Sequence, residues 1–218
     1  MCLILVGWRL PGGERLAVAA NRDEFHARPA APAAFWDDHP AILAGRDLEA
    51  RGTWMGISRN GKFAAVTNYR GAREPRAAES RGALVSRFLH DGPSAAEYIA
   101  GLKPKAAAYS GFNLLASDGT ELWWISNRGG EPRSLAAGIY GLGNLLLDSP
   151  DIEPRKRSFA DALEYGPAVE PLFSVLAEAR IVDALYGTRC STVYFGGRYA
   201  ERSFAPDGSE QETLHYVL

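Results

Sequence analysis

Cysteine is scarce in this chain, since only Cys2 and Cys190 occur among its 218 residues. Two cysteines cannot form a framework of several disulfides or a four-cysteine zinc site. The histidines are also few and show no metal-ligand spacing; they are His26, His39, His90 and His215. The absence of a C-x-x-C-H motif excludes covalent haem attachment. We therefore expect neither a metal site nor a resident cofactor.

An excess of charge and a long hydrophobic run are lacking as well. The net charge of -2 provides no general attraction to nucleic acid or to anionic membranes. The apolar run at residues 2–8 is much shorter than the ~20 residues that a membrane-spanning helix needs. It also lacks the basic start and the small-residue cleavage site of a secretory signal. We expect a cytoplasmic protein with no membrane span and no nucleic-acid partner.

Apolar residues, in contrast, are plentiful and make up 46% of the chain, enough for a substantial core. No Ser/Gly-rich linker divides the sequence, which predicts one domain over residues 1–218. The common nucleotide and hydrolase motifs do not occur: there is no P-loop, no H-E-x-x-H and no G-x-S-x-G. The stretch "GLGNLL" at 141–146 lacks the third glycine of a dinucleotide-binding loop.

The order of expected elements is strands, helices, strands, helices and strands. Apolar runs and turn residues predict early strands at 2–8, 15–23, 53–58 and 62–69, with Asn60-Gly61 as a hairpin turn and the Ala/Pro-rich segment 28–35 as a loop. Helical spacing or capping predicts helices at 81–90, 94–102, 155–165 and 169–181. Later strands are expected within 112–127, at 138–144 and at 190–197, 199–208 and 212–218. This order predicts an α+β fold of packed antiparallel sheets covered by helices.

Cys2 is the first candidate for chemistry. Methionine before so small a residue is usually removed, which would give Cys2 both a thiol and a free α-amine. The amine, with a reference pKa near ~7.7, could act as general base for the thiol, whose reference pKa is ~8.5. The alternative is that Cys2 is a small buried hydrophobe at the start of a strand.

The second candidate is the charged run Asn21, Arg22, Asp23 and Glu24. As a solvated turn it would contribute little, because exposed ion pairs are weak. If the first two strands form a hairpin, however, the end of the second lies beside the start of the first. Asp23 would then approach the Cys2 amine and orient it, as a third group orients the base of a catalytic triad.

Three further polar residues stand at predicted strand ends. Asn68 and Asn144 carry amides that can stabilise an oxyanion when they are held rigidly, although asparagine beside glycine is also common in turns. Arg189 precedes the strand expected at 190–197 and could bind a substrate carboxylate or the Asp23 charge, or lie on the surface.

Taken in order, Cys2, "AANRDEF", "GTWMGIS", "AAVTNYRG", "GFNLL", "YGLGN" and "YGTRCSTVYF" resemble the NRDE protein family, whose eukaryotic members are called transport and Golgi organisation proteins. This family is distantly similar to the N-terminal-nucleophile hydrolases, in particular the cysteine branch with bile salt hydrolases and penicillin V acylases. The resemblance implies a four-layer αββα sandwich of antiparallel sheets. It runs from the first residues to about Phe195.

The resemblance also implies roles for individual residues. Cys2 matches the nucleophile, Asp23 the aspartate that holds the amine, and Asn68 and Asn144 the asparagines around the oxyanion. Arg189 is matched to a late arginine of the catalytic group. Implied substrate contacts are Asn21, Arg22, His26 and Trp54. One departure is clear: related hydrolases carry an arginine a few residues before the aspartate, where this chain has Ala19 and Ala20.

Three functions follow as hypotheses. The first is an amidohydrolase that cleaves a small C–N amide, with Cys2 as nucleophile after removal of Met1. The second, implied by the resemblance, is a non-catalytic protein that binds and transports haem or a lipid or acyl ligand, with His26 and Cys2 as candidate haem ligands. The third is a structural protein without catalysis, since a fold does not determine a function.

Overall fold

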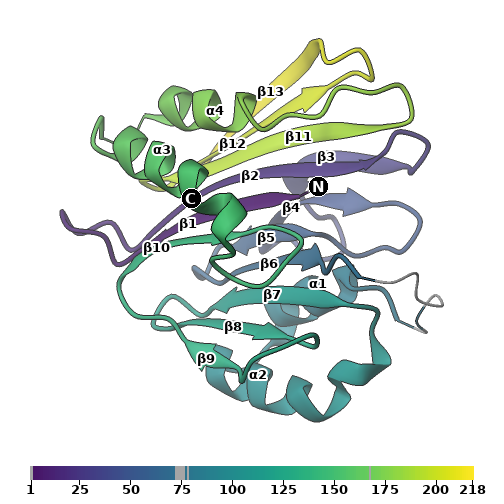
Figure 1. The fold of residues 1–218 in the computed structure, drawn as a ribbon. Coiled ribbons are helices and arrows are strands. Elements are labelled where there is room, and N and C mark those ends of the chain that lie inside the picture. Colours follow the sequence, from purple (N-terminus) through teal and green to yellow (C-terminus); the bar gives the residue numbers. More distant parts are fainter. Residues whose placement is uncertain (1, 72–76, 78, 167) are drawn as a thin grey trace. The chain divides into compact units, whose positions relative to one another are not determined.

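The computed structural model describes residues 2–71, 77, 79–166 and 168–218 (Figure 1). By its internal contacts the chain divides into two compact units. The first holds the residues up to Arg28 together with Ala137–Gly143 and Leu147–Leu218. The second holds Pro29–Ala136 and Asn144–Leu146. Each unit contains one antiparallel sheet and helices that cover one face of it.

The sheet of the first unit has the strand order β10-β1-β2-β11-β12-β13. Its strands are β1 (Leu3–Trp8), β2 (Leu16–Phe25), β10 (Gly138–Leu142), β11 (Tyr186–Phe195), β12 (Arg198–Phe204) and β13 (Glu210–Val217). The short 3₁₀ helix η2 (Pro150–Ile152) leads into α3 (Glu153–Leu163), which α4 (Val169–Ala177) follows. Both α-helices pack on one face of this sheet (Figure 1).

Side chains alternate between the two faces of the sheet along β1 and β2, and those on the helix-covered face form the core of this unit. Leu3 and Leu5 of β1 and Ala19 of β2 point toward Phe159 and Leu176 of the helices. Ile4 lies between Leu3 and Leu5 and points to the other face, yet it too is buried. Burial of both faces explains why β1 reads as a continuous apolar run instead of an alternating one.

The sheet of the second unit has the order β3-β4-β5-β6-β7-β8-β9. Its strands are β3 (Ala30–Phe35), β4 (Ile42–Asp47), β5 (Met55–Ser58), β6 (Phe63–Asn68), β7 (Phe112–Ser117), β8 (Leu122–Ser126) and β9 (Arg133–Ser134). The helices are α1 (Gly82–Asp91), α2 (Ala95–Leu102) and the 3₁₀ helix η1 (Lys103–Ala108). Phe88 and Ile99 of the helices share a core with Ile42 and Leu114 of the sheet.

Local sequence signals account for several boundaries. Ser94 and Glu97 form the expected capping box at the start of α2, each side chain accepting a backbone N–H of the other. The hairpin at Asn60-Gly61 also forms, but only Gly61 takes a positive φ, +81°. Because Ser58 bonds to Lys62 across the turn, the loop has three residues rather than two.

Three expectations need correction. The Ala/Pro-rich segment 28–35 is not wholly a loop, because Ala30–Phe35 forms β3. Proline is tolerated there because β3 is an edge strand and its pairing with β4 is irregular between Ala31 and Ala34. The strand expected from Cys190 begins earlier, at Tyr186, and the helix expected to reach Ile181 ends at Ala177.

None of the helices in the described ranges is both long and apolar enough to cross a membrane.

Candidate functional site

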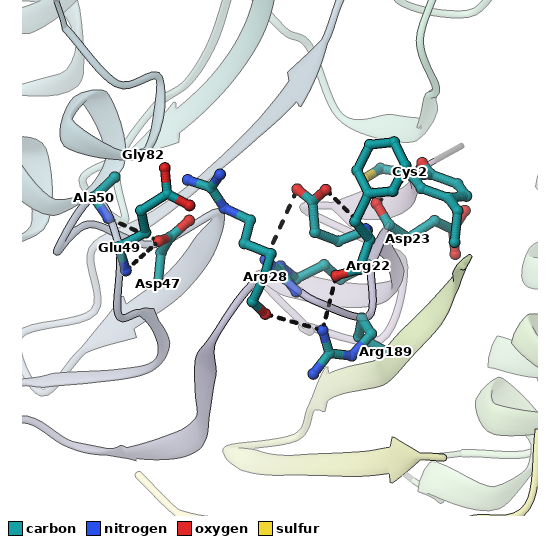
Figure 2. A network of polar contacts seen from close by, with 12 residues as sticks. Cys2, Arg22, Asp23, Arg28, Asp47, Glu49, Ala50, Gly82 and Arg189 are labelled. Carbon is teal, nitrogen blue, oxygen red and sulfur yellow. Dashed lines mark hydrogen bonds and ion pairs between the residues drawn. The ribbon is translucent and has the colours of Figure 1, made fainter. Parts of the chain in front are cut away.

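The antiparallel pairing of β1 with β2 brings Cys2 to Asp23, as the sequence predicts. Leu3 is paired with Asn21, so the residue before β1 lies beside the end of β2. The Cys2 thiol donates a hydrogen bond to the backbone carbonyl of Asp23, with 3.7 Å between sulfur and oxygen. Figure 2 shows the two residues close together, with Arg22 between them and Arg189. The hairpin that turns at residues 11–13 therefore brings Cys2 and Asp23 together, although they lie 21 positions apart in the sequence.

The thiol lies in an environment that favours its protonated form. Burial raises the pKa of the Cys2 thiol above its ordinary value, and the negative charge of Asp23 raises it further. A hydrogen bond with the Asp23 backbone and, to a smaller extent, the positive charge of Arg22 lower this pKa, but burial outweighs them. A thiol of this kind needs a base that takes its proton when it attacks.

Asp23 itself is held by β11. Its side chain is buried, and its Oδ1 accepts a hydrogen bond of 2.6 Å from the hydroxyl of Thr188. Its backbone carbonyl accepts a second bond, of 3.1 Å, from the hydroxyl of Tyr186. The same carbonyl also accepts the hydrogen bond from the Cys2 thiol. Two side chains of one neighbouring strand thus fix both the carboxylate and the main chain of Asp23.

Arg22 points to the opposite face of β2 from Asp23, because successive side chains alternate across a strand. It is buried and pairs in the sheet with Cys190 of β11. Its guanidinium lies 4.0 Å from the carboxylate of Glu24. Although Ala19 and Ala20 supply no charge, Arg22 thus acts on the Cys2 thiol from a different position of the same strand.

Asn21 occupies the helix-covered face of β2 and is completely buried. Its Nδ2 donates to the carbonyl of Leu176 in α4 at 2.9 Å, and its Oδ1 accepts from Ser191 at 2.6 Å. This side chain joins the sheet to α4, and its role as a substrate contact stays a prediction.

Arg189 lies within β11 rather than before it. Its Nη1 donates to three main-chain carbonyls, those of Phe25 at 3.1 Å, His26 at 3.3 Å and Arg28 at 3.1 Å. Burial and the charge of Arg22 both lower its pKa. The guanidinium is thus engaged by the turn that follows β2, and its binding to a substrate carboxylate stays a prediction.

His26 stands in the same turn and is half-buried. Its Nε2 lies 3.0 Å from the carbonyl of Asp183, and its backbone N–H donates to the carbonyl of Leu185. Beside it, the ring of Phe25 meets that of Tyr186 edge to face at 5.2 Å. The turn after Asp23 is thus tied to the segment that leads into β11.

The two predicted oxyanion asparagines lie together in the second unit. Asn144 donates through Nδ2 to the backbone carbonyl of Asn68 at 2.7 Å, and its own carbonyl accepts from the N–H of Arg70 at 2.6 Å. Trp54, the remaining predicted contact, precedes β5 in this unit, and its carbonyl accepts from Val66.

Sequence reasoning missed three residues around these groups: Thr188, Tyr186 and Asn113. Asn113 of β7 is completely buried and donates to the carbonyl of Leu145 at 2.8 Å, which fixes the segment that carries Asn144. The signals were the short patterns "YGTR" and "GFNLL", but a lone threonine or asparagine in a strand reads as an ordinary core polar residue.

Over the described residues, no group of three or more histidine, cysteine, aspartate or glutamate side chains is arranged to hold a metal ion.

Comparisons with known proteins give the family and the fold of the chain. The family model described as "Transport and Golgi organisation 2" matches residues 1–184. A transport and Golgi organization protein 2 homolog of Bos taurus is 37% identical over 223 aligned residues, which cover 82% of this chain and 81% of the bovine protein.

Solved structures share the fold at low sequence identity. A Caenorhabditis elegans ortholog of N-acylethanolamine-hydrolyzing acid amidase superposes with a TM-score of 0.56 and 14% identity over 100% of both chains. Penicillin V acylase of Agrobacterium tumefaciens gives a TM-score of 0.60 and 12% identity, over 100% of this chain and 86% of that one. The predicted fold class, an α+β fold of the N-terminal-nucleophile hydrolase type with antiparallel sheets, is thereby confirmed.

Proposed function

This chain belongs to the transport and Golgi organisation 2 family, and we propose that it is an N-terminal-cysteine amidohydrolase that cleaves a C–N amide bond. The observation that carries the proposal is the meeting of Cys2 with Asp23 at the adjoining ends of β1 and β2. An N-terminal nucleophile requires a thiol, an α-amine and a carboxylate near that amine. Once Met1 is removed, Cys2 supplies the first two and Asp23 the third.

The raised pKa of the Cys2 thiol fits this scheme. A separate base is not needed when the α-amine of the same residue takes the thiol proton during attack. With a reference pKa near ~7.7, such an amine is partly neutral at physiological pH and can act in this way. Asp23 orients the amine and stabilises the ammonium that forms, as the aspartate of a serine protease does for its histidine.

The reaction proceeds in two halves. Sγ of Cys2 bonds to the carbonyl carbon of the amide while its proton moves to the α-amine, which gives a tetrahedral oxyanion. When the C–N bond breaks, the leaving nitrogen takes that proton, and a thioester remains on Cys2. Water then attacks the thioester with the α-amine as base, which releases the carboxylic acid and restores the thiol.

The family resemblance assigns the stabilisation of the oxyanion to Asn68 and Asn144, which both belong to the second unit. Amide donors are effective in this role when they cannot reorient during the reaction. Within the second unit the amide of Asn144 is held by its bond to the Asn68 main-chain carbonyl, and the bond from Asn113 to Leu145 holds the residue next to it.

The test compares two chains that differ only in their first residue. One is released from a cleavable fusion so that Cys2 is the N-terminus, and the other carries one glycine before Cys2. Both are incubated with N-acylethanolamines, penicillin V and acyl aminomethylcoumarins of increasing acyl length. Release of amine is measured by mass spectrometry or fluorescence.

We expect turnover from the chain that starts at Cys2 and none above background from the glycine-extended chain. Cys2→Ala should abolish activity, whereas Cys190→Ala should retain it. Equal turnover by both chains, or full activity of Cys2→Ala, would contradict the proposed mechanism.

The alternative of haem or acyl-ligand transport has no comparable observation in its favour. Nε2 of His26, a candidate haem ligand, is hydrogen bonded to the carbonyl of Asp183. A haem titration read at the Soret band gives an independent check. A saturable, shifted band that is lost in His26→Ala would support the transport function.

A further inference from the structure

One extra residue in β11 lies opposite the catalytic end of β2. Thr188 pairs with Asp23 and Cys190 pairs with Arg22, so Arg189 has no partner of its own in the ladder. This irregularity is a β-bulge, which bends a strand and redirects the side chains beside it. Here it leaves Thr188 facing Asp23, while Arg189 reaches the carbonyls of the turn after β2.

The hydroxyl of Thr188 is held on both sides. It accepts the backbone N–H of Ile181 at 2.8 Å and donates to Oδ1 of Asp23 at 2.6 Å. A hydroxyl has a single proton, so acceptance from Ile181 leaves that proton directed to the carboxylate. A distance of 2.6 Å is typical of a charge-assisted O–H···O⁻ bond.

Main-chain contacts with β11 fix the position of Ile181 beside Thr188. The N–H of Thr188 donates to the Ile181 carbonyl at 2.9 Å, which closes the intervening segment into a loop. A Cβ at Gly187 would lie 2.8 Å from that carbonyl, so only glycine permits this approach without displacement. Because α4 ends at Ala177, Ile181 lies outside the helix and its main chain can bond to β11.

We infer that Thr188 is a positioning residue, which fixes the Asp23 carboxylate in the orientation that holds the Cys2 amine. This inference rests on the proposed amidohydrolase function and adds to it a residue that never touches the substrate. Its effect on Cys2 passes through Asp23. A valine of nearly the same shape removes the hydroxyl, and a serine keeps it.

The experiment measures acylation of Cys2 by p-nitrophenyl acetate. All chains start at Cys2 and carry Cys190→Ala, so that a single thiol is present. The thiol sulfur bonds to the acetyl carbon, p-nitrophenolate leaves, and the thiol proton passes through the amine to solvent. The absorbance of nitrophenolate gives the rate, and peptide mass mapping locates the acetyl group on Cys2.

Thr188→Val is expected to slow acylation about tenfold to hundredfold, the change that corresponds to one hydrogen bond to a charged group. Thr188→Ser should recover most of the rate. In an Asp23→Asn background, Thr188→Val should have little further effect, because a residue that acts through Asp23 loses its influence when the carboxylate is gone.

Several outcomes would overturn the inference. They are an unchanged rate in Thr188→Val, a Thr188→Ser chain as slow as Asp23→Asn, or additive losses in the double variant. If Thr188→Val does not fold, Thr188→Ala, which also removes the hydroxyl, takes its place in the comparison with Thr188→Ser. Failure of the unsubstituted chain to become acetylated at Cys2 would instead remove the proposed hydrolase function itself.

Discussion

Replacing Arg189 separates a structural role from a substrate-binding role. Arg189→Met keeps the length of the apolar stem and removes the guanidinium, whose Nη1 bonds to the carbonyls of Phe25, His26 and Arg28. If the guanidinium stabilises the turn after β2, its loss should lower the stability of the fold. If it binds a substrate carboxylate, its loss should raise KM.

The structure gives the magnitude. Nη1 has two hydrogens for three carbonyls, and these bonds are partly solvent-accessible. A hydrogen bond to a charged group contributes about 1.5–3 kcal/mol, and water can replace part of what is lost. We therefore expect a loss in the free energy of unfolding of about 1.5–3 kcal/mol. For a chain of this size, that lowers the melting temperature by roughly 3–12 °C.

The assay is thermal unfolding followed by circular dichroism, with Arg189→Lys as the matched control. Lysine keeps the charge but presents a single ammonium, so it should recover only part of the stability. A melting temperature of Arg189→Met within about 1 °C of the unsubstituted chain, well below that range, together with a raised KM, would refute the structural role.

Three further outcomes are expected. Asn113→Ala should lose about 1–3 kcal/mol of stability, because the Leu145 carbonyl loses its buried donor, and urea unfolding would show no loss if this is wrong. Burial raises the pKa of Asp118, but hydrogen bonds from Thr120 and neighbouring backbone N–H groups outweigh it and bring the pKa to about 2. This folded-state pKa lies below the unfolded value of ~3.9, so the stabilisation from Asp118 is present above pH ~4 and is lost as the pH falls toward ~2. The urea midpoints of Asp118→Asn and of the unsubstituted chain should therefore converge over that range. Burial raises the pKa of the Cys190 thiol far above its ordinary value, so in a Cys2→Ala chain iodoacetamide should label Cys190 only after denaturation, and labelling of the native protein would contradict this.

Much of the fold follows from local patterns in the sequence. The apolar run of β1 and the Pro-Gly-Gly turn after it predict the first hairpin, and that hairpin alone brings Cys2 to Asp23. The capping box of Ser94 and Glu97 marks the start of α2 correctly. These features were predictable because each depends on residues close together in the chain.

The features that were missed depend on contacts between distant residues. Pro32 obscured β3, because a proline is allowed in a strand only when that strand lies at an edge. The bulge at Arg189 was not predictable from local sequence, because the carbonyls that Arg189 binds lie 161 to 164 positions away, at the end of β2 and in the turn after it. The roles of Thr188 and Asn21 depend on their partners in the same way. The residue types in the sequence predicted the candidates, but only the pairing of β2 with β11 shows which of their side chains bond to one another.

The arrangement around Cys2 also bears on how the thiol is activated. Related hydrolases carry an arginine a few residues before the aspartate, and this chain has alanines there. Arg22 lowers the pKa of the Cys2 thiol from another position, but burial outweighs it. A thiolate formed in advance is therefore not what this environment favours. In the mechanism that we propose, attack is therefore coupled to proton transfer, and the α-amine of Cys2 accepts the proton. In this mechanism the orientation of that amine by Asp23, and of Asp23 by Thr188, determines the rate more than the acidity of the thiol does.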